Sequence, residues 1–309
     1  MKNKIITKVA LIGGGPACAT AAIQLFRSGI EIILISKEIG GTIKNANLVE
    51  NLIGYPEGVV GREFAKSFRL QLTKVGVPVI LEEVLTVEQV TNNYSIKTAE
   101  TEIISEYLII GTGSFPMKLD VEGEKESFLN GKLFYEVFNI KQLTDKKDIG
   151  IIGSGDVAYD YALNLQDAAN KISIIHRTDK TSSLPILQKR VKNANNIVVF
   201  KNHVVKKLVL KDDKIILEVE EDGKRITMIK DLVLVAIGRK PNYDFLSVDL
   251  ISEYNDPKVD SKLKFVGDVT KNNFRQVSIA MGDGMKVAME TVKRITEKEG
   301  YHGTFRQVW

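Results

Sequence analysis

Two short glycine motifs are the features of this sequence that point most directly to chemistry. The first, at residues 13–18, reads Gly-x-Gly-x-x-Cys, and the second, at residues 153–158, reads Gly-x-Gly-x-x-Ala. The first glycine of such a motif makes a tight turn, and the second lets backbone N–H groups approach a pyrophosphate at the positive end of a helix. The third position packs helix against strand, so we expect Cys18 to be tolerated there with slightly wider packing. Two such motifs indicate two bound dinucleotides, as in electron transfer between flavin and nicotinamide.

A nucleotide-binding glycine motif must lie between a strand and a helix, and the apolar patterns predict this for both motifs. A short apolar run precedes each motif, a helical pattern follows it, and a second apolar run comes next. The predicted segments are Val9–Ile12, Ala17–Arg27 and Glu31–Ile35 around the first motif, and Ile149–Ile152, Val157–Ala168 and Ile172–Ile175 around the second.

The rest of the chain supplies further strands and helices but no third motif. Short β-rich runs over residues 77–104 predict a small antiparallel insertion, and Asp222-Gly223 between alternating runs predicts a hairpin. We therefore predict an α/β fold of two Rossmann-like three-layer dinucleotide-binding domains, the second inserted into the first. Residues 1–115 and 245–309 would form one domain, and residues 116–244 the other. Further predicted elements are a helix at Arg62–Val75, strands at Glu102–Ile104, Tyr107–Ile110, Leu232–Ile237 and Leu263–Val266, and a helix at Gln276–Lys298.

Composition excludes several other classes of protein. The 309 residues carry a formal net charge of +4, too little to suggest binding to nucleic acid. One cysteine and three histidines are too few for the usual structural zinc or iron–sulfur site, so no such site is expected. The apolar run near the N-terminus is broken at once by glycines, so we expect no membrane span and a cytoplasmic protein.

Further short motifs follow one another along the chain in a fixed order and spacing. They are residues 13–17, 40–42, 50–51, 54–58, 108–113, 153–156, 176–177, 237–242, 267–268 and 275–276. Together they make the chain resemble the low-molecular-weight thioredoxin reductase family of flavoproteins over nearly its whole length. The resemblance implies that the discontinuous domain binds FAD, that the inserted domain binds NADPH or NADH, and that the protein is a homodimer.

The resemblance also implies roles for single residues. In the FAD site, Gly13 and Gly15 would hold the pyrophosphate, Gly41, Thr42 and Asn51 would lie along the flavin, and Asp268 would accept a hydrogen bond from the ribityl chain. Arg275, Gln276 and Val277 would direct backbone N–H groups and a helix dipole at the flavin ring. Gly153, Gly155 and Asp156 would hold the nicotinamide dinucleotide, with His176 and Arg177 beside its adenosine ribose. The other predicted cofactor-binding residues are Pro16, Ala17, Ser36, Lys37, Val84, Gly111, Thr112, Gly113, Ser154, Val157, Lys180, Gly238 and Gly267.

The sequence departs from the family in the residues that carry its redox disulfide. These reductases have a Cys-x-x-Cys pair just before the second glycine motif, whereas residues 132–138 here contain no cysteine. Disulfide exchange needs an attacking thiolate and a partner sulfur, so reduction of thioredoxin by the family's route is excluded. The one cysteine, Cys18, lies inside a glycine turn and is expected to be buried and inert.

The coenzyme preference and the C-terminal tail also differ from the family pattern. Arg177 and Lys180 could bind a 2′-phosphate with fewer arginines than is usual, and no acidic residue ends the strand, so the charges favour NADPH over NADH. The tail resembles that of the thioredoxin-reductase-like ferredoxin/flavodoxin–NADP⁺ reductases. Either His302, Phe305 or Trp309 stacks near the flavin, or the tail packs on the surface or is disordered.

These observations predict an NAD(P)H oxidoreductase that passes electrons through FAD to a carrier such as ferredoxin or flavodoxin. Three alternatives stay open: an NAD(P)H oxidase that reduces O₂, a flavoprotein that hardly uses nicotinamide, and a non-enzymatic FAD-binding protein. Hydride transfer to a flavin needs no protein nucleophile, so no catalytic residue is predicted. His176, Glu50 and Asp156 could move protons, but hydrogen bonds to cofactor or backbone explain them more simply.

Overall fold

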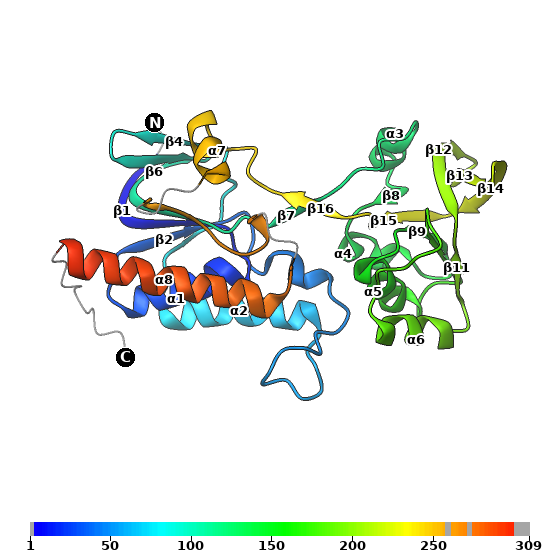
Figure 1. Ribbon diagram of the computed structural model, residues 1–309, viewed down its shortest axis with the longest axis horizontal. Coiled ribbons are helices and arrows are strands. Elements are labelled where there is room, and N and C mark those ends of the chain that lie inside the picture. Colours follow the sequence, from blue (N-terminus) through cyan, green and yellow to red (C-terminus); the bar gives the residue numbers. More distant parts are fainter. Residues whose placement is uncertain (1–2, 257–260, 271–273, 300–309) are drawn as a thin grey trace. The chain divides into compact units, whose positions relative to one another are not determined.

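The computed structural model describes residues 3–256, 261–270 and 274–299, which divide into two compact units (Figure 1). The first unit lies within Met1–Lys44, Val49–Phe115 and Pro241–Trp309, and the second within Asn45–Leu48 and Pro116–Lys240. Each unit contains a mainly parallel sheet. The predicted α/β class, with one nucleotide-binding fold inserted into another, is confirmed.

The sheet of the first unit is parallel at its centre and antiparallel at one side. The first strand of the chain, β1, lies between β2 and β6 and runs parallel to both. A glycine motif that follows such a central strand opens at the point where the strand order reverses, which is where ligands bind in open α/β sheets. The strand order is β3 (Val79–Ile80), β2 (Ile32–Ile35), β1 (Asn3–Ile12), β6 (Thr101–Ile110), β5 (Asn93–Lys97) and β4 (Thr86–Val90), with β17 (Leu263–Phe265) also paired to β6.

Alternate residues of β1 bury their side chains on opposite faces of this sheet. Val9 and Leu11 pack against the helices, whereas Ala10 and Ile12 pack on the other face with the β4–β5 hairpin. Both faces are therefore covered at the end of β1, which explains why Val9–Ile12 reads as a continuous apolar run. The covering helices are α1 (Pro16–Arg27), α2 (Gly61–Val75) and α8 (Val277–Glu299) on the first face (Figure 1), and α7 (Val248–Asn255) on the second.

The second unit repeats the plan around β9 (Asp148–Ile152), which lies between two parallel neighbours. Helices cover one face, and a three-stranded antiparallel sheet covers the other. The predicted hairpin is confirmed, because Asp222 and Gly223 both have positive φ, at 48° and 78°. The strand order of the parallel sheet is β11 (Ile197–Phe200), β10 (Lys171–Ile175), β9, β15 (Leu232–Val235) and β8 (Leu133–Phe134). The covering helices are α4 (Val137–Ile140), α5 (Asp156–Leu165) and α6 (Pro185–Asn193), and the covering strands are β12 (His203–Lys211), β13 (Lys214–Glu221) and β14 (Lys224–Lys230). Helix α3 (Glu124–Leu129) precedes β8.

The boundaries of the units differ from the predicted ones in two places. The chain returns to the first unit at Pro241 rather than at residue 245, through β16 (Arg239–Pro241), which pairs with β7 (Ser114–Pro116). Residues Asn45–Leu48 also group with the second unit, because the Asn47 N–H donates to Asp160 and Asn45 makes further hydrogen bonds there. Long-range side-chain pairing of this kind leaves no local sign in the sequence.

Several elements also differ from the sequence patterns. Two strands were expected between residues 102 and 110, but β6 is one continuous strand, because it pairs with β1 from Asn3 to Ile12. Helix α5 ends at Leu165, three residues earlier than predicted. Short elements such as β8, α3 and α6 carry too few residues to show a period. No helix in the part of the chain that the structure describes is long and apolar enough to cross a membrane.

Cys18 fits its turn by a different route from the wider packing that was expected. Its side chain is fully buried, and a Cβ atom at Gly111 would lie 2.5 Å from the Cys18 Sγ and 3.1 Å from the Val266 Cγ2. A real side chain cannot approach a neighbour this closely. Gly111, which directly follows β6, therefore supplies the space that the third glycine of the motif would otherwise have supplied.

This packing predicts that Gly111→Ala lowers the free energy of unfolding by about 1–3 kcal/mol, the usual cost of overpacking a core. Cys18→Ala should relieve much of the clash, so the double variant should lose less stability than the two single losses added together. Urea unfolding of the four proteins measures this coupling. Gly282→Ala is the matched control, because its Cβ meets no atom within 4 Å, and it should be neutral or slightly stabilising. Additive losses at residues 18 and 111 would contradict the packing account.

Candidate functional site

The carboxyl ends of four parallel strands bring the predicted FAD-binding residues to one edge of the first unit. Ile12 is paired with both Ile35 and Ile110, and Ile110 is paired with Phe265, so all four strands end at the same level. The predicted residues that follow these strand ends are Gly13, Gly15, Ser36, Lys37, Gly111, Thr112, Gly113, Gly267 and Asp268. The structure thus gathers residues that are up to about 250 positions apart in the sequence.

The three consecutive glycines of the first motif have different physical reasons for lacking a side chain. A Cβ at Gly13 would lie 2.3 Å from the Gly111 carbonyl oxygen, and one at Gly14 would lie 2.1 Å from that of Glu38. Gly15 has an ordinary φ of −78°, and a Cβ there would meet nothing within 4 Å. Neither protein packing nor backbone conformation requires this glycine. The open space in front of it fits a ligand at the start of α1, which has no side-chain cap.

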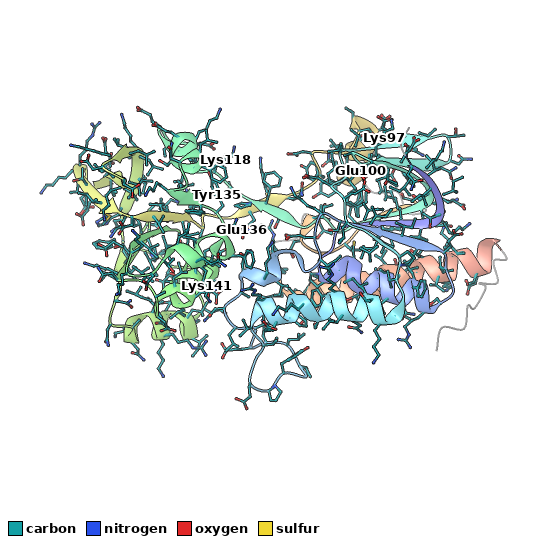
Figure 2. The ribbon with its side chains drawn as sticks, turned by 180° about the vertical axis from the view of Figure 1, so that it is seen from behind. Lys97, Glu100, Lys118, Tyr135, Glu136 and Lys141 are labelled. Carbon is teal, nitrogen blue, oxygen red and sulfur yellow. The ribbon has the colours of Figure 1, made fainter. Side chains whose placement is uncertain are left out.

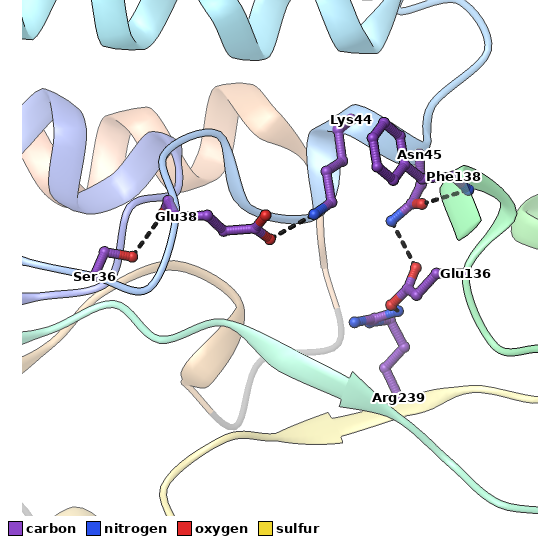
Figure 3. Close-up of polar contacts among 7 residues, drawn as sticks. All are labelled: Ser36, Glu38, Lys44, Asn45, Glu136, Phe138 and Arg239. Atoms are coloured by element: carbon purple, nitrogen blue, oxygen red, sulfur yellow. Dashed lines mark hydrogen bonds and ion pairs between the residues drawn. The ribbon is translucent and has the colours of Figure 1, made fainter. Parts of the chain in front are cut away.

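A short loop after β2 forms one wall beside the glycine turn. The Ser36 hydroxyl donates to the Glu38 carbonyl oxygen at 2.7 Å, and the Glu38 carboxylate pairs with Lys44 at 2.5 Å (Figure 3). Lys37 is exposed and pairs with Glu83 at 3.0 Å. Both predicted residues, Ser36 and Lys37, therefore already have protein partners, and Ser36 holds the shape of the loop.

Gly41 and its neighbour Thr42 start the short helix η1 (Gly41–Asn45) beside the same turn. Gly41 has a φ of +61°, and its Cβ would lie 3.1 Å from the Cα of Gly15. Gly267 likewise makes room for Ala17, since a Cβ at Gly267 would lie 3.0 Å from the Ala17 Cβ. Small residues at these positions let three backbone segments approach one another around α1.

The residues predicted to lie along the flavin ring are partly connected to one another. The Asn51 side-chain amide donates to the Gln276 Oε1 at 3.0 Å, which joins a loop before α2 to the start of α8. Val277 is the first residue of α8, and Arg275 precedes it half-buried. The Thr112 hydroxyl donates to the Asn242 carbonyl oxygen. Val84 packs against the core around the β4–β5 hairpin, so its predicted contact with a cofactor remains a prediction.

In the second glycine motif, as in the first, one glycine is required by close backbone packing and another has open space beside it. Gly153 has a φ of +148°, and its Cβ would lie 2.2 Å from the Ala236 carbonyl oxygen. Gly155 has an ordinary φ of −94°, and the nearest atom to its Cβ would be the Ser182 Oγ at 3.5 Å, a normal contact distance. Neither the backbone conformation at Gly155 nor the packing of neighbouring protein atoms therefore excludes a Cβ there. The space beside it, at the start of α5, fits a second pyrophosphate.

A loop after β10 closes over this second motif, a feature that the sequence did not reveal. The Thr181 hydroxyl and the Ser182 N–H both donate to the Ser154 carbonyl oxygen, at 2.7 and 3.1 Å. The Leu184 N–H donates to the Asp156 carboxylate at 2.7 Å. Asp156 therefore anchors the loop, rather than offering a free proton-transfer group. Of the other predicted residues, Val157 is 40% exposed and Gly238 has a φ of +126°.

His176, Arg177 and Lys180 follow β10 at the same edge but differ in exposure. Arg177 and Lys180 are exposed, whereas the His176 side chain is fully buried beside Tyr159. Burial, and secondarily the charge of Lys201, lowers the pKa of His176, so its ring is neutral at pH 7. Neither ring nitrogen has a hydrogen-bond partner among the described residues. Contact of His176 with a coenzyme stays a prediction, and Arg177 and Lys180 are the exposed candidates.

A carboxylate occupies the region where the resemblance expects a redox disulfide. Glu136 lies between β8 and α4 (Figure 2) and accepts hydrogen bonds from Asn45 at 2.6 Å and Tyr161 at 3.1 Å. It also pairs with Arg239 at 2.8 Å (Figure 3). Burial, and then the Glu136 charge, raises the pKa of Tyr161. This region is thus a packed polar cluster with no nucleophilic sulfur.

The chemistry of the remaining titratable groups fits the same conclusion. Burial raises the pKa of Cys18 to about 12, so its thiol stays protonated at neutral pH, as expected of an inert cysteine. Among residues 3–256, 261–270 and 274–299, no cluster of three His, Cys, Asp or Glu side chains could hold a metal ion. The tail residues proposed to cover the flavin, His302, Phe305 and Trp309, lie outside the described residues.

Comparison with known proteins decides the family. The model of the pyridine nucleotide-disulphide oxidoreductase family matches residues 7–284. The chain belongs to this family. It is thioredoxin reductase-like in sequence and in its two-domain dinucleotide-binding structure, and membership implies binding of FAD and a nicotinamide dinucleotide.

Thioredoxin reductases are among the relatives that the chain matches over nearly their whole length. The chain is 30% identical over 313 residues to the enzyme from Rickettsia felis, covering 94% of this chain and 98% of the relative. It is 26% identical over 306 residues to the enzyme from Chlamydia pneumoniae, covering 93% and 98%. The solved thioredoxin reductase of Lactococcus lactis is similar with a TM-score of 0.87 and 28% identity, covering 94% of this chain and 99% of that one.

The open space at Gly15 and Gly155 predicts variants that separate binding from folding. Gly15→Ala should leave the stability of the FAD-free protein within about 1 kcal/mol, since a helix-start glycine is worth little more than this, yet it should strongly reduce bound FAD. Gly155→Ala should keep FAD and lose affinity for the nicotinamide coenzyme. The flavin-to-protein absorbance ratio and urea unfolding measure the two effects. As the control, Gly13→Ala should destabilise the FAD-free protein, because its Cβ would lie 2.3 Å from the Gly111 carbonyl oxygen. Full FAD content in Gly15→Ala would contradict this site.

The Asp156 anchor predicts different effects for two substitutions. Asp156→Asn keeps an oxygen that can accept the Leu184 N–H, whereas Asp156→Ala removes it and should loosen the loop at residues 181–184. If the coenzyme must then order the loop, the cost is close to the net value of one hydrogen bond, about 0.5–1.5 kcal/mol. This predicts about a three- to tenfold weaker affinity for the coenzyme in Asp156→Ala, with little change in Asp156→Asn. Hydrogen exchange of the Leu184 amide reports the anchor directly. Equal loss of affinity in both variants would instead assign Asp156 a direct contact with the coenzyme.

Proposed function

We propose that this protein is an FAD-dependent NAD(P)H oxidoreductase that passes electrons to an external one-electron carrier such as ferredoxin or flavodoxin. The observation that carries the proposal is the polar cluster around Glu136, which stands where the family's redox disulfide is expected. Both glycine motifs keep the open space that a dinucleotide needs. The cofactor half of the family's chemistry is thus supported, while the disulfide half lacks its reacting atoms.

No sulfur in this chain can replace the missing disulfide. Cys18 is the one cysteine, it is fully buried, and its thiol stays protonated at neutral pH. Disulfide exchange requires a thiolate that can reach its target. Electrons that arrive on the flavin must therefore leave to an acceptor outside the chain.

The residues of the first unit fit FAD. Gly13, Gly15 and the start of α1 would hold its pyrophosphate, and Asp268 would accept a hydrogen bond from its ribityl chain. The start of α8, at Gln276 and Val277, would place backbone N–H groups and the positive helix end near the flavin, which favours extra negative charge there. Bound FAD supplies the redox chemistry, because it takes two electrons as a hydride and can release them singly.

The residues of the second unit fit a nicotinamide dinucleotide. Gly155 and the start of α5 would receive the pyrophosphate, while Arg177 and Lys180 would lie toward the adenosine ribose. Because both are cations, NADPH is the favoured coenzyme. The protein's part in hydride transfer is to orient the coenzyme, so no general acid or base is assigned.

The remaining parts of the proposal concern assembly and location. A homodimer is proposed from the likeness to thioredoxin reductases, and a cytoplasmic location from the near absence of cysteine. The small positive charge of +4 mildly favours an acidic carrier.

The proposal predicts that, with NADPH, the protein reduces cytochrome c in the presence of ferredoxin or flavodoxin and fails to reduce thioredoxin. Cys18→Ala should retain FAD and keep the carrier-dependent rate within about twofold, because the thiol takes no part in electron transfer. Carrier-dependent reduction of cytochrome c and consumption of O₂ are measured side by side. Rapid O₂ consumption that no carrier suppresses would identify an oxidase, and thioredoxin reduction that depends on Cys18 would overturn the proposal.

A further inference from the structure

The carboxyl edge of the second unit carries a cation that the glycine and His-Arg motifs do not include. Lys201 directly follows β11, whose last residue, Phe200, is paired with Ile175 at the end of β10. The His176 N–H continues this pairing by donating to the Phe200 carbonyl oxygen at 2.8 Å. Lys201 therefore lies beside the strand end from which Arg177 continues, although 24 positions separate the two in the sequence.

Two further observations place the Lys201 charge at this edge. Its ammonium group pairs with Asp179 at 3.3 Å, and its charge contributes to the lowered pKa of the buried His176. Asp179 belongs to a turn in which the Thr178 hydroxyl donates to the Lys180 carbonyl oxygen at 3.2 Å. The turn is fixed at its far end by Thr181, which is bonded to the second glycine motif. The ion pair therefore joins β11 to the segment that carries Arg177 and Lys180.

We propose that Lys201 is a specificity-determining residue, which binds the 2′-phosphate of NADPH together with Arg177 and Lys180. The inference rests on the proposed function, in which the second unit binds a nicotinamide dinucleotide. A phosphate monoester carries nearly two negative charges at pH 7 and has three acceptor oxygens, so one exposed arginine and one exposed lysine match it incompletely. Lys201 adds a third donor from a neighbouring strand.

Asp179 sets the balance between the two coenzymes. Its carboxylate holds Lys201 at the edge, but it also opposes an incoming phosphate through its negative charge. Asp179 lies in the turn four residues after the end of β10 at Ile175. From that turn, its carboxylate can accept a hydrogen bond from a ribose 2′-hydroxyl, which is the group that NADH offers in place of the phosphate. Lys201 thus favours the phosphorylated coenzyme, and Asp179 limits that preference. Both side chains are at least half exposed, so solvent screens their charges. Each residue should therefore change the ratio of the affinities for NADPH and NADH by a modest factor.

The test compares two adenosine fragments that differ only in the 2′-phosphate. Binding of 2′,5′-ADP and of 5′-AMP to the FAD-loaded protein is measured by calorimetry for the wild type and for Lys201→Gln, Asp179→Asn and Lys206→Gln. Lys206 is the matched control: it pairs with Glu220 at 3.5 Å, and its side chain is 51% exposed, against 50% for Lys201. It lies within β12 and does not directly follow a strand of the parallel sheet.

Lys201→Gln should weaken binding of 2′,5′-ADP about three- to tenfold and leave binding of 5′-AMP unchanged, because only the 2′-phosphate loses a partner. Asp179→Asn should tighten 2′,5′-ADP about two- to fivefold, and Lys206→Gln should change neither. Equal effects of Lys201→Gln on both fragments, no effect on either, or no preference for 2′,5′-ADP in the wild type would overturn the assignment. Reduction of the flavin by NADPH is measured separately. If Lys201-dependent binding appears but the flavin is not reduced, the proposed function fails and this inference stands.

Discussion

The structure depends on keeping the start of two helices open to a ligand. Helix α1 begins after Gly15 and helix α5 after Gly155, and neither helix has a side-chain cap on its first N–H groups. Unpaired N–H groups at a helix start are costly when buried without a partner, so a bound phosphate is the natural acceptor. The other glycines of each motif serve this arrangement by letting backbone segments approach to distances that a Cβ would forbid.

The same constraint applies to the residues that surround the third position of each motif. The third position of the first motif is Cys18, and the space for its sulfur comes from Gly111 at the end of a strand far away in the sequence. In the second motif, a Cβ added at Gly153 would lie 3.3 Å from the Ala158 Cβ, so Gly153 makes room for the side chain at the third position. We call each glycine motif together with the start of the helix that follows it a cradle. A cradle can therefore tolerate variation in sequence as long as the space around its turn stays the same.

The local patterns of the sequence were sufficient to predict both strand–glycine motif–helix units and the antiparallel β4–β5 hairpin. Within the predicted antiparallel insertion, β3 is different, because it pairs parallel with β2. Parallel strands that end together gather Ser36, Gly111 and Gly267 without further information. Sequence reasoning missed contacts that depend on tertiary folding. The Asp156–Leu184 anchor, the Glu136–Arg239 pair and the Lys201–Asp179 pair each join segments that no periodic pattern connects. The passage of Asn45–Leu48 into the second unit is of the same kind.

The absence of a redox disulfide bears directly on the proposed function. With Glu136 held by Asn45, Tyr161 and Arg239, this region stabilises structure instead of relaying electrons. The two cradles would then perform the only steps that need the protein: binding FAD and presenting a nicotinamide coenzyme. In the proposed function the electron acceptor is a separate molecule, and its identity would decide the biological role.

The central claim is that the two cradles hold two different dinucleotides that exchange a hydride. The most direct measurement is an anaerobic titration of the FAD-loaded protein with NADPH and, separately, with NADH, followed by the flavin absorbance band. The account predicts that NADPH bleaches the band with close to one equivalent, and that NADH does so at higher concentration. A band that neither coenzyme changes, although dithionite bleaches it, would contradict the claim and show that the second glycine motif does not serve flavin reduction.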